Sequence, residues 1–370
     1  MNTAPARVGD AVGSIDTPAL VVDLDALERN IERMADYARR HRLRLRPHAK
    51  THKSAAIAKL QVAAGAVGVC VQKLGEAQAL ADAGVADLYI SNQIVDERKL
   101  ARLAVLAGRA TLAVAVDSPL GIERLAAALK AAGTTLDVFV EVDVGHGRCG
   151  VAPTAAGTLA QQVVSHGLRF AGLQAYHGRA QHLRGVAERE AAIRHAVALA
   201  RAAQASVTAA GLDCPLVTGG GTGSFAFEAA GGVHGEIQPG SYVFMDRDYA
   251  ANDLGGGAPG FEQALFVKSQ VMSRGQAHAV VDAGHKSHAI DSGLPQVWQR
   301  RLEFANGGDE HGILRSAGDE LPALGETVWL VPGHCDPTVN LHDHLVAVRG
   351  GLAQGTVEAV WPVDARGRGG

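Results

Sequence analysis

Long hydrophobic runs and paired cysteines are both missing from this sequence. The longest candidate for a membrane span, LAVLAGRATLAVAV at 103–116, is broken by Arg109. The N-terminal segment MNTAPARVGDAVGSIDTPAL has no basic region followed by an apolar core, as a signal peptide would. The four cysteines, at positions 70, 149, 214 and 335, are widely spaced and follow no disulfide pattern. We therefore expect reduced thiols, a cytoplasmic location and no membrane partner.

An excess of charge of one sign is also missing, and aromatic residues are scarce. The 35 basic and 38 acidic side chains give a formal net charge of -3, so there is no electrostatic reason to expect nucleic acid as a partner. Glycine is abundant, with 45 residues, as tight turns and close approaches of backbone to a ligand require. The length of 370 residues, with 47% hydrophobic and 20% charged residues, predicts a soluble globular protein of about two domains.

Short apolar runs alternate with helical patterns over the first two thirds of the chain. The runs predict strands near 43–50, 66–71, 87–91, 111–116, 136–143, 169–176, 215–218 and 235–239. Helical spacing recurs between them, for example at 24–41, 74–83, 95–107, 120–132 and 185–210. This alternation predicts an α/β fold, a (β/α)8 TIM-like barrel. An open doubly wound sheet is the alternative, but it would call for an early GxGxxG after a strand, and there is none.

The pattern changes near residue 262, where strand-like segments and Gly-rich turns replace the helices. We expect a barrel over 15–262 and a smaller all-β domain over 263–370. The N-terminal residues 1–14 are compatible with joining the β domain, and the first twenty residues with joining either one. The last six residues, ARGRGG, are expected to be frayed.

The segment RPHAKTHK at 46–53 ends the first predicted barrel strand. Alternate side chains of a strand share a face, which predicts that Arg46, His48, Lys50 and His52 point the same way. The C-terminal end of a barrel strand is where active sites lie. A solvated basic strand is the plain alternative.

Two glycine-rich loops follow the last two predicted barrel strands. They are VTGGGTGS at 217–224 and QPGSY at 238–242. Their backbone N–H groups are suited to bind an anion, and barrels often bind phosphate at these two positions. A third loop, VEVDVGHGRCG at 140–150, carries Arg148 and on its own indicates only a turn.

The segment PGHCDPTVNLHDH at 332–344 offers a possible metal site. In an extended chain His334 and Asp336 face one side and Cys335 the other. An imidazole and a carboxylate are N and O ligands for Mn²⁺, Mg²⁺ or Zn²⁺. A polar turn explains the segment equally well when it is taken alone.

The ordered set of motifs resembles the fold-type III PLP enzymes of the alanine racemase superfamily. It is most similar to the family of D-threonine aldolase, 3-hydroxy-D-aspartate aldolase and D-serine dehydratase. The resemblance rests on DTPALVVDLDAL at 16–27, VQKLGEA at 71–77, GLQAYHG at 172–178 and the five motifs above. It covers nearly the whole chain and implies a pyridoxal 5'-phosphate (PLP) barrel, a β domain that carries metal ligands, and a homodimer.

The resemblance also implies roles for particular residues. Lys50 matches the Schiff-base lysine, and Arg148 matches the arginine near the phenolic oxygen of the cofactor. The residues that match the rest of the cofactor site are Gln72, Tyr176, His177, Gly221, Thr222, Gly240, Ser241 and Tyr249. His334 and Asp336 match the metal pair.

The residue at the second metal position separates the subfamilies. D-serine dehydratases usually have Cys there, whereas Asp336 fits the aldolases and suits Mn²⁺ or Mg²⁺ better than Zn²⁺. We therefore expect a PLP- and metal-dependent aldolase that cleaves a D-3-hydroxy amino acid, of D-threonine or 3-hydroxy-D-aspartate type, to glycine and an aldehyde. His52 is the candidate for proton transfer at the substrate hydroxyl. A dehydratase or racemase on the same scaffold and a non-catalytic PLP carrier are the alternatives.

Overall fold

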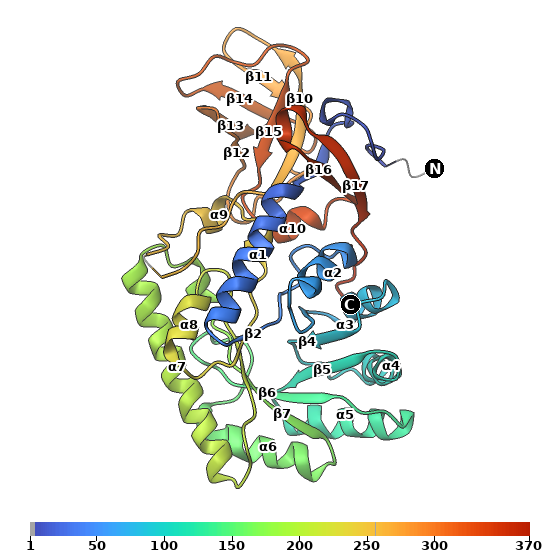
Figure 1. The fold of residues 1–370 in the computed structure, drawn as a ribbon, viewed down its shortest axis with the longest axis vertical. Helices are drawn as coiled ribbons and strands as arrows, with labels where there is room; N and C mark the ends of the chain where they lie inside the picture. The colour runs from blue at the N-terminus through green and yellow to red at the C-terminus, as the bar shows by residue number, and fades with distance from the viewer. Residues whose placement is uncertain (1–3, 256) are drawn as a thin grey trace.

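A computed structural model describes residues 4–255 and 257–370. Eight parallel strands form one sheet in the order β2-β9-β8-β7-β6-β5-β4-β3 (Figure 1). These strands are β2 (Arg44–Leu45), β3 (Val69–Val71), β4 (Asp87–Ile90), β5 (Thr111–Val116), β6 (Asp137–Glu141), β7 (Arg169–Gln174), β8 (Val217–Gly219) and β9 (Glu236–Ile237). Each lies within or next to a predicted strand.

The two edge strands of this sheet meet and close it. His48, just after β2, bridges Cys70 of β3 in parallel register. The N–H of Val67 donates to the carbonyl of Leu45 at 2.9 Å, and the N–H of Cys70 donates to the carbonyl of Pro47 at 2.8 Å. The prediction of a TIM-like barrel is therefore confirmed.

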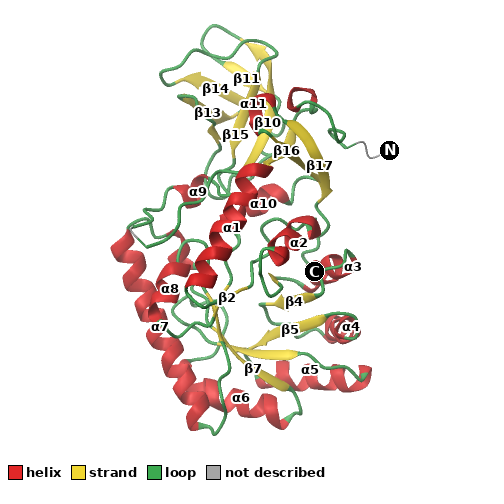
Figure 2. Ribbon diagram, viewed as in Figure 1, coloured by secondary structure: helices red, strands yellow, loops and turns green. Residues whose placement is uncertain are grey.

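Helices lie outside the barrel strands (Figures 1 and 2). They are α2 (Ala55–Ala63), α3 (Leu74–Asp82), α4 (Glu97–Ala107), α5 (Pro119–Ala132), α6 (Ala156–Ser165), α7 (Val186–Ala209) and α8 (Phe225–Gly231). Local sequence sets their ends: α5 starts with Pro119 after a Ser118 cap and stops at Gly133, where φ is +66°. Buried Val, Leu, Ile and Ala side chains pack the helices on the strands.

The C-terminal domain is a nine-stranded sheet at one end of the molecule (Figure 2). Its strands are β1 (Ala19–Asp23), β10 (Leu265–Arg274), β11 (Ala279–Val281), β12 (Gln296–Val297), β13 (Leu302–Asn306), β14 (Gly312–Ser316), β15 (Thr327–Val331), β16 (His344–Arg349) and β17 (Thr356–Pro362). Three short helices belong to the segments around the sheet: α9 (Arg247–Ala250), α10 (Cys335–Val339) and α11 (Gly351–Gln354).

The first strand of the chain lies in this second sheet. β1 pairs antiparallel with β10 and parallel with β16, and α1 (Leu24–Arg40) then leads down to the barrel (Figure 1). The range 15–262 expected for the barrel therefore includes one strand of the β domain. The alternating burial of a strand cannot tell which sheet it will join, because partners distant in sequence supply its hydrogen bonds.

The C-terminal tail returns from the β domain to the barrel. The N–H of Ala365 donates to the carbonyl of Lys53 at 3.0 Å, and the carbonyl of Gly370 accepts from the N–H of Gly75 at 3.1 Å. The expectation of a frayed tail is wrong, because these bonds satisfy backbone groups of both segments. Within the described ranges no helix is both long and apolar enough to cross a membrane.

Candidate active site

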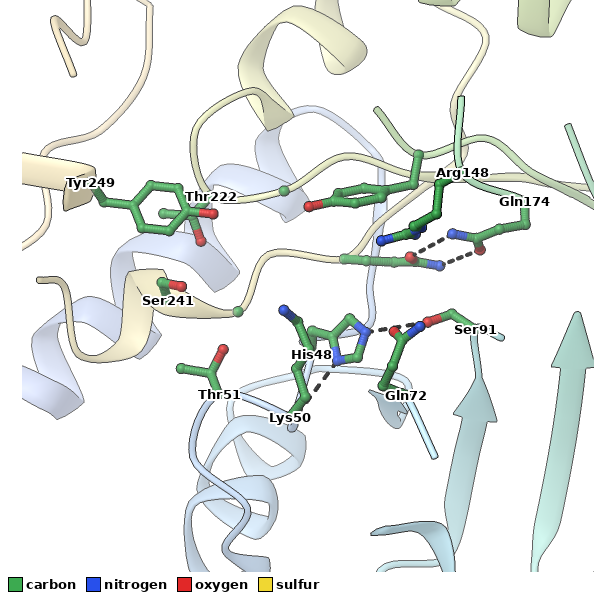
Figure 3. Close-up of a pocket in the computed structure, with 14 residues that line it drawn as sticks. His48, Lys50, Thr51, Gln72, Ser91, Arg148, Gln174, Thr222, Ser241 and Tyr249 are labelled. Atoms are coloured by element: carbon green, nitrogen blue, oxygen red, sulfur yellow. Dashed lines mark hydrogen bonds between the residues drawn. The ribbon is translucent and has the colours of Figure 1, made fainter. Parts of the chain in front are cut away.

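A cavity of about 230 Å³ lies where the barrel strands end, and Figure 3 shows the residues that line it. Segments that follow the carboxyl ends of the strands supply most of its wall, as in other barrels. The residues that line it are His48, Lys50, Thr51, Gln72, Ser91, Arg148, Gln174, Tyr176, Gly221, Thr222, Gln238, Gly240, Ser241 and Tyr249. Apart from His52, His177 and the metal pair, this set includes every residue predicted for the site.

Lys50 reaches this cavity from a turn. β2 ends at Leu45, and the chain turns until Lys53, whose φ is +51°. Arg46 consequently points elsewhere and forms ion pairs with Asp87 and Glu236. The prediction that four alternate side chains share a strand face is wrong, because alternation holds only in extended backbone.

The Lys50 amine lies 2.9 Å from a carboxylate oxygen of Asp336. The negative charge of Asp336 raises the pKa of Lys50 above its usual value despite burial. Burial opposes ionisation of Asp336, but the nearby Lys50 charge outweighs it and lowers the pKa of that carboxyl. The predicted cofactor lysine from the barrel and a predicted metal ligand from the β domain are thus in direct contact.

His52 is buried and its ring is not part of the cavity wall. Its Nδ1 accepts from the N–H of Ser54 at 3.1 Å, so Nε2 carries the proton and donates to Gln61 Oε1 at 3.2 Å. Burial lowers the pKa of His52 to about 4. With both nitrogens engaged by the protein, the ring is in no position to take a proton from a substrate in this cavity.

His48 occupies the cavity wall in place of His52 (Figure 3). Its Nε2 lies 3.2 Å from Ser91 Oγ. Burial, followed by the nearby Lys50 charge, lowers the pKa of His48 to about 3, which keeps the ring neutral. The motif at 46–53 contained His48, but only the turn geometry distinguishes it from His52.

The two glycine-rich loops meet at one side of the cavity. Thr222 Oγ1 accepts from the N–H of Tyr242 at 3.0 Å and so joins them. A Cβ atom on Gly240 would come within 2.5 Å of Thr51 Oγ1, so only glycine permits this approach. No described residue accepts a hydrogen bond from the amides of Thr222, Gly240 or Ser241, and Thr51 Oγ1 is a buried hydroxyl without a partner. These donors fit a phosphate group.

The opposite wall is polar and partly aromatic. The Arg148 guanidinium lies 5.7 Å from the centre of the Tyr176 ring. Gln174 and Gln238 hydrogen-bond to each other at 3.0 and 3.1 Å. The sequence did not identify these two glutamines or Ser91 as site residues, although both glutamines lie in motifs named above. Glutamine alone carries no chemical signal that would have identified them.

His177 lies behind Tyr176 and outside the cavity wall. Its Nδ1 accepts from the N–H of Ala180 at 3.3 Å, and its ring faces His146 with centres 6.2 Å apart. Successive residues at a strand end point in opposite directions, which sends Tyr176 inward and His177 away.

The predicted metal pair brackets the start of α10. The helix begins at Cys335, whereas the sequence indicated an extended segment. Cys335 is nevertheless turned away and buried, and Asp336 faces Lys50. His334 Nδ1 is hydrogen-bonded to Asp291 Oδ2 at 2.7 Å. In the described part of the chain, no group of three or more His, Cys, Asp or Glu side chains is arranged to hold a metal ion by itself. The imidazole and carboxylate donors fit a site that leaves positions for substrate or water.

Comparisons with known proteins agree with this geometry. Residues 22–248 match the family model of the alanine racemase N-terminal domain, and residues 264–348 match a putative serine dehydratase domain. D-threonine aldolase from Arthrobacter sp. is 46% identical over 368 residues, covering 98% of this chain and 96% of that protein. The chain belongs to the D-threonine aldolase family.

Two further relatives of this family extend over the full length. The 3-hydroxy-D-aspartate aldolase of Paracoccus denitrificans is 44% identical over 381 residues, which cover 99% of this chain and 96% of that protein. The crystal structure of D-threonine aldolase from Filomicrobium marinum is 50% identical, with a TM-score of 0.96, and covers 98% of this chain and 99% of that one. The resemblance inferred from the motifs is confirmed, and the chain is an aldolase of the alanine racemase-like PLP family.

Proposed function

We propose that this enzyme uses PLP and a divalent metal ion to cleave the Cα–Cβ bond of a D-3-hydroxy amino acid, releasing glycine and an aldehyde. The observation that carries the proposal is the 2.9 Å contact between Lys50 Nζ and Asp336. This contact supports the proposal, because the predicted cofactor lysine and the carboxylate that we propose as a metal ligand are then within reach of a single small substrate. D-threonine and 3-hydroxy-D-aspartate are the substrate candidates, by analogy with the relatives.

Different residues of the barrel would hold different parts of the cofactor. Lys50 is placed to bond its aldehyde carbon, and the free amides of the two glycine-rich loops to hold its phosphate. Arg148 is placed to neutralise its phenolic oxygen. When bound, PLP supplies an electron sink for the negative charge left at Cα. The neutral His48 adds no charge beside the ring, because its pKa of about 3 keeps it unprotonated at neutral pH.

His334 and Asp336 are the residues that would hold the metal ion. Mn²⁺ or Mg²⁺ suits a set of one imidazole and one carboxylate better than Zn²⁺ does. When bound, such an ion lowers the pKa of a hydroxyl that coordinates it. Asp336 would thus serve both the metal ion and the Lys50 amine, which it contacts at 2.9 Å.

Lys50 is also placed to move a proton. Its amine points into the cavity and Asp336 stabilises its protonated form. We assign it the return of a proton to the Cα atom of the glycine product. We do not propose His52 as the base for the substrate hydroxyl, because Gln61 and Ser54 occupy its ring nitrogens.

Dehydration on the same scaffold is the second candidate, favoured by the match of the β domain to a serine dehydratase model. Against it stands Asp336, where dehydratases of this type usually have a thiolate. Racemisation requires a second acid–base group across the cofactor. Burial raises the pKa of the Tyr249 hydroxyl well above its usual value, so that phenol is a poor base near neutral pH.

Product analysis separates these reactions. We expect the PLP- and Mn²⁺-loaded enzyme to yield stoichiometric glycine with acetaldehyde from D-threonine, or with glyoxylate from 3-hydroxy-D-aspartate. A chelator should abolish both. Ammonia and an oxo acid without glycine would establish a dehydratase instead. The homodimer and the cytoplasmic location remain part of the proposal, and light scattering of the pure enzyme tests the first.

A further inference from the structure

We infer that Asp291 positions the metal-binding histidine, fixing the His334 ring so that Nε2 is the nitrogen left to coordinate. The inference rests on the metal pair of the proposed function. Asp291 Oδ2 lies 2.7 Å from His334 Nδ1. An ionised carboxylate only accepts hydrogen bonds, so Nδ1 carries the proton and Nε2 keeps its lone pair. No other described residue forms a hydrogen bond with the His334 ring.

The segment that carries Asp291 is held against His334 independently of this pair. Thr338 Oγ1 donates to the carbonyl of His334 at 2.7 Å and accepts from the N–H of Ala289 at 3.0 Å. A Cβ atom on Gly333 would lie 2.1 Å from the carbonyl oxygen of Gly293, so the two backbones touch here. These contacts on both sides of Asp291 present its carboxylate to the imidazole at a fixed place.

Stability does not explain the pair. The side chains of Asp291 and His334 are 52% and 23% exposed, and exposed ion pairs contribute little to folding. A carboxylate behind a metal-binding histidine, by contrast, sets its tautomer and ring orientation, and its loss typically weakens metal binding about 10–100-fold.

The same domain contains a matched control. His285 Nε2 lies 2.9 Å from Asp309 Oδ1, and these side chains are 36% and 53% exposed. This pair belongs to the same domain and has similar chemistry, but neither residue is one of the two predicted metal ligands. Loss of Asp309 therefore reports the general effect of breaking an exposed His–Asp pair.

The test is Mn²⁺ titration of the PLP-loaded enzyme, with free Mn²⁺ followed by electron paramagnetic resonance. Asp291→Ala is expected to raise the Kd for Mn²⁺ by about 10–100-fold. Asp291→Asn should stay close to wild type, because its amide oxygen still accepts the hydrogen bond from Nδ1–H. Asp309→Ala should match wild type.

Three results would overturn the inference. The first is an unchanged Kd in Asp291→Ala. The second is equal weakening in Asp291→Asn and Asp291→Ala, which would make Asp291 a direct carboxylate ligand. The third is equal weakening in Asp309→Ala. A wild-type enzyme without affinity for Mn²⁺ would instead remove the metal site of the proposed function, a failure that the wild-type titration and product analysis reveal without any variant.

Discussion

Two lysines three positions apart have opposite surroundings. Lys50 Nζ lies in the cavity beside Asp336, whereas Lys53 Nζ is held by Glu76 Oε1 at 2.6 Å. Of these two described lysines, Lys50 is the one that lines the cavity, so it is the one that we propose to bond the cofactor. We expect borohydride reduction of the PLP-loaded enzyme, followed by peptide mapping, to label Lys50. A label on Lys53 or Lys73 would contradict this assignment.

Asp336 is the residue that favours an aldolase over a dehydratase in the sequence. Asp336→Ala is expected to lose Mn²⁺ and to slow glycine formation by about 10²–10³-fold, the usual effect of removing one group that stabilises a developing oxyanion. Bound PLP should remain, since Lys50 and both phosphate loops are intact. Visible absorbance measures the bound PLP, and metal analysis measures the bound Mn²⁺.

Asp336→Cys serves as the matched variant, because it should shift the metal preference toward Zn²⁺. Full activity of Asp336→Ala in the presence of a chelator would rule the site out.

At the scale of an element, the start of α3 holds two parts of the active site together. The Glu76 carboxylate accepts the backbone N–H groups of Gln72 and Lys73 at 2.8 and 3.0 Å and binds the Lys53 ammonium. The ion pair is nearly buried, at 12% and 5% exposure. Glu76→Gln should cost about 3–5 kcal/mol of unfolding free energy, because it leaves a buried cation unpaired. Urea unfolding measures this.

The double variant with Lys53→Met tests the reason for that loss. It removes the unpaired cation, so it should recover most of the stability of Glu76→Gln. If the double variant is as unstable as the single one, the lost hydrogen bonds to the Gln72 and Lys73 amides are responsible rather than the buried charge.

At the scale of the whole molecule, stability should depend on pH through Glu228. This carboxyl is buried beneath the glycine-rich loop after β8, and burial raises its pKa from 4.5 to about 7. Between these values the folded protein holds a proton that the unfolded chain has released. The unfolding free energy therefore falls as pH rises through this window, by about 3 kcal/mol.

Glu228→Gln removes this titration and should be more stable relative to wild type at pH 8 than at pH 4.5. Denaturant unfolding at both values measures the difference. Glu32→Gln, on an exposed position of α1, makes the same change of charge as a control. An identical pH profile for wild type and Glu228→Gln would contradict the prediction.

The sequence by itself determined the barrel strands and most of the predicted residues that line the cavity. Apolar runs and helical spacing are local properties, so all eight barrel strands could be located from them. The glycine-rich loops were recognisable because anion binding favours glycine and small hydroxyl residues after particular strands, whereas the role predicted for Lys50 came from the resemblance to the PLP enzymes. The start of α10 and the ordered tail were missed, since their backbone bonds are made with distant segments.

Only the tertiary structure decided which side chains share the cavity. It places His48 in the wall and His52 behind it, because the strand ends at Leu45 and strict alternation ends with it. It pairs β1 with strands more than two hundred residues away. It also brings Asp336 to Lys50 and Asp291 to His334. None of these pairs has a sequence signal, because a contact between distant residues depends on how whole domains pack and not on local propensity.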